Sequence, residues 1–155
     1  MSVSNSILSF MNILRSSLLL LILGLTSCAT SVSSHQQAVA LATRATGVSN
    51  PHLYWVPSSG AIADATFVTM SKAAPSRMAH DLASMFKTVG ANLGSVVVSG
   101  PGSRKAGQVC ADALRLQTNP LPGLTVVFIG TAEDAEAARQ AAAKAQCRFH
   151  HVLPQ

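Results

Sequence analysis

The sequence predicts a small, single α/β domain with a mostly parallel sheet. Two apolar runs, 95–98 (SVVV) and 124–129 (LTVVFI), have the length and the β-branched composition of strands that are buried on both faces. A segment of helical character follows each run, and strands that alternate with helices form βαβ units. The C-terminal half is therefore expected to be a β-α-β-α-β layer, with an extra helix at 75–89 packed beside it.

The elements that precede this layer are predicted from shorter patterns. Residues 38–45 fit a short helix that ends before an Asn-Pro turn. Residues 52–57 form a β-prone run that a proline closes, and residues 67–70 (FVTM) are a second expected strand. Within 75–89, apolar residues recur at helical spacing; the proline at the start suits a first turn, and Gly90 suits the stop.

Two helices and one strand complete the expected layer. Ser103 is placed to cap a helix that runs through about residue 116. Thr131, with Asp134 three residues later, is expected to start a second helix that reaches about residue 146. Residues 147–153 then close the chain as a strand.

A leucine-rich segment at 17–25 leads into the sequence LTSC at residues 25–28. The segment is too short to span a bilayer but long enough for the core of a signal peptide, and Arg15 supplies a positive charge before it. In these features the N-terminus resembles the lipobox of bacterial lipoproteins. The resemblance implies that the signal is cut just before Cys28 and that Cys28 carries the lipid. An ordinary secretory signal and an uncleaved single-pass anchor are the alternatives.

The resemblance divides the chain into three parts. Residues 1–27 would be the signal peptide, with Met11 as an alternative start because the first ten residues carry no positive side chain. Residues 28–37 would be a lipidated, serine-rich tether, and residues 38–155 the periplasmic domain. In lipoproteins an aspartate after the lipidated cysteine often favours retention in the inner membrane. Ala29 stands there, so we expect an outer-membrane protein that faces the periplasm.

The charges and aromatic residues are not arranged as in nucleic-acid-binding proteins. The chain has 11 Lys or Arg against 6 Asp or Glu, and only Arg104 and Lys105 are adjacent basic residues beyond the signal. A nucleic-acid binder concentrates basic residues on one face and adds stacking aromatics, whereas this chain has one Trp and one Tyr. Neither a P-loop nor a complete dinucleotide motif is present, so we expect neither nucleic acid nor a cofactor as a ligand.

Two cysteines, Cys110 and Cys147, remain once Cys28 is lipidated. An even pair in an oxidising compartment favours a disulfide, which would stabilise the domain by roughly 3–4 kcal/mol on the chain-entropy model. Two buried free thiols are the alternative.

Two glycine-bearing turns, at 99–104 and 130–131, follow the two central strands, where ligands of parallel sheets bind. Each turn leads into the N-terminus of a helix, whose free N–H groups attract anions. The alternative is that these glycines only make tight turns. The candidate anion-binding residues are Gly100, Gly102, Ser103, Arg104, Lys105, Gly130 and Thr131.

His150 and His151 are the residues that most invite a metal or acid–base interpretation. Adjacent residues of a strand point to opposite faces, so this pair cannot easily hold one ion, and we expect no metal site. Cys110 lies on the apolar stripe of its predicted helix, and no Gly-x-Ser-x-Gly sequence is present. We therefore expect no catalytic residue.

Tyr54 and Trp55, the only Tyr and Trp of the chain, are candidates for a partner surface because prolines flank them. The alternative is an edge strand with its aromatic side chains in the core.

Together these patterns predict a lipid-anchored periplasmic module that binds other envelope components and performs no chemistry. By analogy with small lipoproteins, it would be an accessory subunit of an envelope-spanning machine of the secretion, conjugation or pilus type. A lipoprotein that binds a small anionic ligand or a peptidoglycan fragment at the glycine turns is the second hypothesis. An enzyme, the third, would need a cleft that brings His150 or His151 to an acidic or nucleophilic group.

Overall fold

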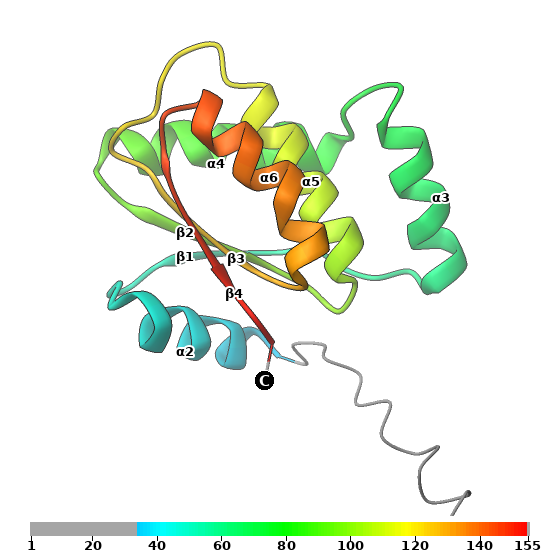
Figure 1. Ribbon diagram of the computed structural model, residues 1–155, viewed down its shortest axis with the longest axis horizontal. Helices are drawn as coiled ribbons and strands as arrows, with labels where there is room; N and C mark the ends of the chain where they lie inside the picture. Colours follow the sequence, from blue (N-terminus) through cyan, green and yellow to red (C-terminus); the bar gives the residue numbers. More distant parts are fainter. Residues whose placement is uncertain (1–33, 155) are drawn as a thin grey trace, which may run out of the picture.

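The computed structural model describes residues 34–154. Its centre is one four-stranded sheet in which every strand is parallel to its neighbours and the strand order follows the chain. The predicted small α/β domain with a parallel sheet is confirmed (Figure 1). The strands are β1 (His52–Trp55), β2 (Ser95–Ser99), β3 (Thr125–Ile129) and β4 (Arg148–Val152).

Helices cover both faces of this sheet. Because crossovers between neighbouring parallel strands are right-handed, helices that connect successive strands fall on the same side. Figure 1 shows α4, α5 and α6 on one side of the sheet and α2 on the other. The helices are α2 (His35–Thr46), α3 (Ala61–Ser71), α4 (Arg77–Ala91), α5 (Ser103–Arg115) and α6 (Ala132–Lys144).

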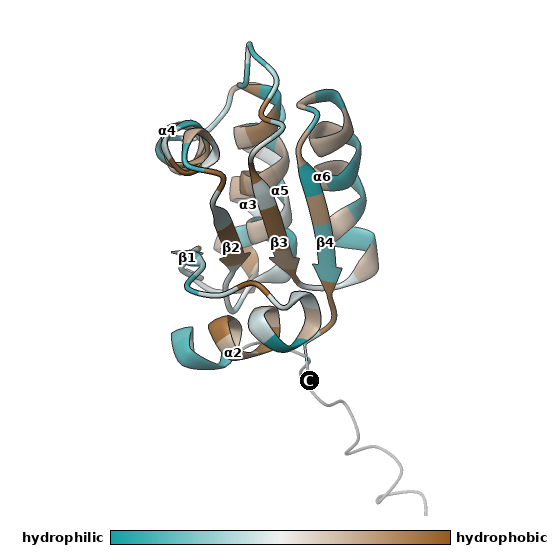
Figure 2. Ribbon diagram, turned by 90° about the vertical axis from the view of Figure 1, so that its left-hand side faces the viewer, coloured by the Kyte–Doolittle hydropathy of each residue, from teal (hydrophilic) through white to brown (hydrophobic). Residues whose placement is uncertain are grey.

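The two central strands are apolar throughout because both of their faces are covered. Val96 and Val98 of β2 pack beneath the α4–α6 layer, together with Phe128 of β3. Val97 and Val127 point the other way and pack beneath α2. Figure 2 shows β2 and β3 as the most hydrophobic strands. This two-sided burial is the reason that the runs at 95–98 and 124–129 lack polar alternation.

The structure corrects the prediction of a strand at 67–70. These residues belong to helix α3, which spans Ala61–Ser71. Short apolar runs do not distinguish a strand from a helix, and this one has no neighbouring strand with which to pair. α3 follows β1 and precedes α4, so the two helices together form the crossover from β1 to β2.

Two helix starts also differ from the predicted ones. α2 begins at His35, and the Ser34 side chain caps it by accepting a hydrogen bond from the Gln37 amide (3.2 Å), so residues 35–37 are helical and not part of a tether. α4 begins at Arg77 because the Ser76 side chain accepts from the Ala79 amide. In both cases a serine hydroxyl satisfies a free N–H of the first turn and fixes the start.

The predicted cap of α6 is confirmed. The Thr131 hydroxyl accepts from the Asp134 amide at 3.2 Å and donates to the Asp134 carboxylate at 2.8 Å.

Within residues 34–154, no helix is long and apolar enough to cross a membrane.

Candidate functional site

The turns that follow β1 and β2 lie against each other at the carboxyl edge of the sheet. The Val56 amide donates to the Ser99 carbonyl at 2.8 Å and extends the pairing of the two strands by one residue. A Cβ atom on Gly100 would overlap the Val56 carbonyl oxygen. Gly100 is therefore required by this close approach of two backbones.

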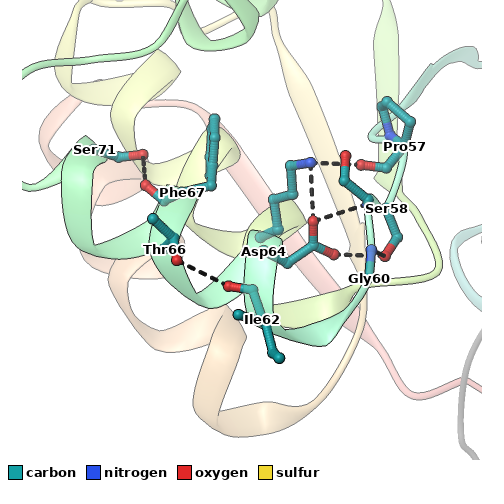
Figure 3. A network of polar contacts seen from close by, with 10 residues as sticks. Pro57, Ser58, Gly60, Ile62, Asp64, Thr66, Phe67 and Ser71 are labelled. Atoms are coloured by element: carbon teal, nitrogen blue, oxygen red, sulfur yellow. Dashed lines mark hydrogen bonds and ion pairs between the residues drawn. The ribbon is translucent and has the colours of Figure 1, made fainter.

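Lys105, the second residue of the basic pair, crosses from α5 to the turn after β1. Its ammonium donates to the Pro57 carbonyl at 2.8 Å and pairs with the Asp64 carboxylate at 3.1 Å (Figure 3). The same ammonium lies 5.0 Å from the centre of the Phe67 ring. With only 6% of its side chain exposed, Lys105 is a buried cation whose partners all come from the chain itself.

Asp64 is the anionic centre of this cluster. It accepts hydrogen bonds from the Ser58 hydroxyl at 2.6 Å and from the Ser59 amide at 3.1 Å, in addition to the bond from Lys105 (Figure 3). Burial opposes ionisation of Asp64, but these hydrogen bonds and the Lys105 charge outweigh it and hold the pKa of the carboxyl below its usual value. The cluster therefore fastens the start of α3 to α5.

The two glycine-bearing turns are brought together, as expected, by a bond between them. The Ser103 hydroxyl accepts from the Thr131 amide at 2.9 Å, and a Cβ atom on Gly130 would overlap that hydroxyl oxygen. Ser103 is therefore not the cap of α5, because Gly102 holds that position and makes no side-chain hydrogen bond. Both candidate hydroxyls, Ser103 and Thr131, bind protein groups.

A pocket of about 410 Å³ lies beside this cluster, between α3 and the start of α5. Gly102 and Arg104 line it, but so does the carboxylate of Asp64, and Lys105 is already neutralised. Of the two basic residues predicted to attract an anion, only Arg104 is exposed. Among the described residues that line this pocket, Arg104 is the one free cation and lies beside a carboxylate, which is weak support for an anion site.

Tyr54 and Trp55 point to opposite faces of the sheet and cannot form one partner surface. The Tyr54 hydroxyl donates to the Met78 carbonyl of α4 at 2.9 Å, and burial, followed by the charge of Asp81, raises its pKa. The Trp55 ring meets the ring of His35 edge to face, with centroids 4.6 Å apart. Both aromatic residues are used to seat helices on the sheet.

Cys110 and Cys147 are free thiols in this structure, so the disulfide expected between them is not formed. Both contribute to the core between the sheet and its α4–α6 layer. Burial and the neighbouring Cys147 raise the pKa of Cys110, and burial raises the pKa of Cys147 to about 11. Neither thiol has the ionised character that a nucleophile needs. Cys28 lies outside the described residues.

His150 and His151 point to opposite faces, as the alternation of a strand predicts. The His151 ring stacks on Phe128, with its Nε2 atom 2.8 Å from the Gly130 carbonyl oxygen, whereas His150 is exposed. Within 34–154, no group of three or more His, Cys, Asp or Glu residues is placed to hold a metal ion.

A second pocket, of about 380 Å³, lies at the amino edge of the sheet, where no site was predicted from the sequence. We call it the amino-edge pocket. The end of α4 forms one wall, and the loop between α5 and β3 forms the other. Most of its lining is apolar; of its three polar side chains, Lys87 and Asn119 are exposed, and the half-buried Gln117 donates to the Ala83 and Ala113 carbonyls. Its residues are Lys87, Gly90, Ala91, Leu93, Gln117, Asn119, Pro120, Leu121, Pro122 and Gly123.

Leu93 is the unusual residue of this pocket. Its φ is +54°, and its amide donates to the Gly90 carbonyl at 3.2 Å, which closes the end of α4. Glycine is the usual residue in this left-handed position, because a side chain is strained there. Leu93 is also 77% exposed, so burial does little to offset the strain. The tripeptide Asn-Leu-Gly after a helix is the sequence signal that could have indicated it.

Close contacts among its neighbouring elements fix the shape of the amino-edge pocket. Leu93 packs closely on Gly123: a Cβ atom on Gly123 would lie 2.7 Å from the Leu93 side chain. A Cβ atom on Gly90 would lie 3.2 Å from Leu124, the residue before β3. The Leu121 amide donates to the Ala145 carbonyl at 2.8 Å, which ties the loop to the end of α6. The pocket is thus held by three neighbouring elements.

No protein-family model, no curated protein and no solved structure matches this chain.

Proposed function

We propose that the protein is a lipid-anchored periplasmic module that binds a protein partner of the cell envelope and performs no chemistry. The lipid is attached at Cys28, in the LTSC sequence that resembles a lipobox. The partner binds at the amino-edge pocket. The observation that carries this second part is Leu93, an exposed apolar side chain in a strained backbone conformation.

The position of the first helix supports this arrangement. α2 begins beside Trp55, the last residue of β1, so the chain reaches the domain at the carboxyl edge of the sheet. The segment from Cys28 to Ser34 spans at most about 20 Å when fully extended. The membrane therefore lies on the carboxyl side, and the amino-edge pocket, at the other end of the strands, faces the periplasm.

The strain at Leu93 supports a binding role. A left-handed residue other than glycine costs on the order of 1 kcal/mol, and glycine at this position would remove that cost. The same left-handed conformation ends α6 at Gln146 (φ 54°), but at Leu93 it carries a large apolar side chain that is exposed. Here it holds a leucine side chain over an apolar pocket, where a partner's aliphatic or aromatic residue could cover it. Lys87 and Asn119 supply exposed polar side chains beside the pocket, as at the rim of an interface, whereas the Gln117 amide is already bonded within the fold.

The partner class that this placement fits is a subunit of an envelope-spanning machine of the secretion, conjugation or pilus type. A module fixed to the outer membrane with its binding pocket toward the periplasm can hold such a subunit at the membrane. The alternative of a small anionic ligand or peptidoglycan fragment at the glycine turns has less support, because Lys105 is engaged by Asp64 and Pro57.

The test combines affinity purification with two leucine variants of the full chain. A C-terminal tag follows β4 and leaves the amino edge free. The tagged protein is recovered from mild-detergent extracts of its host, and the proteins bound to it are quantified by mass spectrometry. We expect Leu93→Gly to unfold at a urea concentration no lower than the wild type and to lose a partner that the wild type retains. The matched control is Leu153→Gly, which removes a leucine that is 62% exposed at the other edge and should keep the partner.

A partner that Leu93→Gly retains at wild-type amounts would contradict the pocket as the binding site. The anchor is tested separately by labelling cells with palmitate. Incorporation into the wild type but not into Cys28→Ser is expected, and equal labelling of both would contradict lipidation at Cys28.

A further inference from the structure

The outer face of helix α3 is apolar and is not covered by the rest of the domain. Ile62 is 87% exposed and Met70 is 70% exposed, the two highest values in α3 for large hydrophobic residues. Figure 1 shows α3 standing apart from the sheet at one side of the molecule. We call this surface the α3 face; its residues are Ala61, Ile62, Ala65, Thr66, Thr69 and Met70.

The α3 face is unpartnered because the helix uses only its other side in the fold. Val68 and Ser71 are buried, and Phe67 packs against the core beside Lys105. Figure 3 shows Phe67 and Ile62 leaving α3 in different directions. Asp64, the only charged residue of α3, is turned toward Lys105. The exposed side of this helix therefore carries no charge at all.

Basic side chains lie beside this face. Arg104 lines the pocket between α3 and α5 together with Ala61 and Ala65, and Lys72 follows the last residue of α3. Both are exposed, and neither has an ion-pair partner in the part of the chain from 34 to 154. An apolar surface with cations at its margin suits a bilayer interface, where the apolar side chains meet acyl chains and the cations meet head-group phosphates.

The α3 face is also within reach of the expected anchor. α3 starts six residues after Trp55, which contacts the first residue of α2, His35. The segment from Cys28 to Ser34 holds that end of the domain within about 20 Å of the lipidated residue. The carboxyl edge of the sheet, with α3 beside it, is thus the side of the domain nearest the bilayer.

We propose that the α3 face lies in the head-group region of the bilayer that holds the lipid on Cys28, with Ile62 and Met70 in contact with acyl chains. Arg104 and Lys72 bind the phosphates of anionic lipids. This inference rests on the lipid anchor proposed above. It gives the domain one orientation, because the anchor and α3 together fix two points of it at the membrane, and the amino-edge pocket is then held toward the periplasm.

A second copy of the chain fits the α3 face less well. An 11-residue helix is about 16 Å long and roughly 10 Å wide, so the face offers about 160 Å² per copy. A stable interface needs about 800 Å² from each partner. Pairing two α3 faces would also bring the cations of both copies near each other. A bilayer requires no such area, because the lipid already holds the domain at its surface.

The experiment uses the full lipidated chain in vesicles of phosphatidylethanolamine and phosphatidylglycerol. Ile62→Cys is labelled with an environment-sensitive fluorophore, with Cys147→Ala to remove the accessible native thiol; Cys110 is fully buried. The matched control places the same label at Lys144→Cys, an exposed position at the end of α6. Flotation with the vesicles is measured for every sample, and spin-labelled lipids serve as quenchers.

We expect blue-shifted emission that spin-labelled lipids quench several-fold more at position 62 than at position 144. Replacement of phosphatidylglycerol by phosphatidylcholine should reduce this quenching. A chain that floats but reports water at position 62 would overturn the inference and leave the anchor intact. Blue-shifted emission without lipid quenching would assign the face to a second copy, which also overturns it. A chain that does not float would overturn the anchor and the inference together.

Discussion

Replacement of Lys105 by methionine separates a structural role of this residue from a ligand-binding one. Methionine keeps the unbranched apolar part of the side chain but removes the ammonium that binds Pro57 and Asp64. If Lys105 served mainly to attract an anionic ligand, its loss would leave the stability of the fold unchanged. The structure predicts a large loss of stability, because Asp64, whose side chain is only 12% exposed, would lose the charge that compensates its own.

The size of the effect follows from the burial of the pair. Removal of one partner of a buried ion pair costs about 3–5 kcal/mol, because the other charge is left without compensation. The Asp64 side chain is 12% exposed and keeps its bonds to Ser58 and Ser59, which places the expected cost at the lower end, about 3 kcal/mol. With a urea slope of about 2 kcal/mol per molar, the midpoint of unfolding should fall by about 1.5 M.

The assay is equilibrium unfolding of the full chain in mild detergent, followed by far-UV circular dichroism. Arg104→Met is the matched control, because Arg104 is adjacent and basic but exposed, and its loss should change stability by less than about 0.5 kcal/mol. The double variant Lys105→Met with Asp64→Asn should be more stable than the sum of the two single effects predicts. Equal midpoints for Lys105→Met and Arg104→Met would show that the Lys105–Asp64 pair does not stabilise the fold.

Three further predictions concern the same edge of the sheet and the start of α6. The pKa of Asp64 is held below its usual value of 3.8, so the stability that the ionised carboxylate contributes is complete well above pH 3.8 and is lost as the pH falls through the lower, folded pKa. The stability of Asp64→Asn should therefore fall less steeply with decreasing pH in that range, and identical acid-unfolding profiles for the variant and the wild type would contradict this. Gly100→Ala should unfold at a clearly lower temperature, because its methyl group would overlap the Val56 carbonyl, and a melting temperature within error of the wild type would show that the two turns can separate without cost. Thr131→Ala should cost about 1 kcal/mol, since it removes the cap of α6, whereas Thr131→Ser should cost less; equal losses in urea unfolding would argue against the cap.

The candidate site could be predicted only in part. The turns at 99–104 and 130–131 do lie together at the carboxyl edge, as the parallel sheet requires. The state of Lys105 could not be predicted, because Asp64, its partner, is 41 residues away in the chain. The amino-edge pocket could not be predicted, because it depends on a loop that bonds to the end of α6, and this contact has no local pattern, although Asn-Leu-Gly is a local signal for the left-handed residue after α4.

The elements with local signals could be predicted before the fold was known. The runs at 95–98 and 124–129 predicted β2 and β3 because strands buried on both faces must be apolar throughout. Thr131 predicted the start of α6 because its hydroxyl satisfies an amide three residues away. Other features could be seen only in the folded chain. The apolar run at 67–70, expected to be a strand, belongs to helix α3, which Asp64 fastens to α5. Tyr54 and Trp55, on the two faces of one strand, contact helices on opposite sides of the sheet. Contacts between residues distant in the chain fix such features, and composition alone does not encode which partner each side chain will meet.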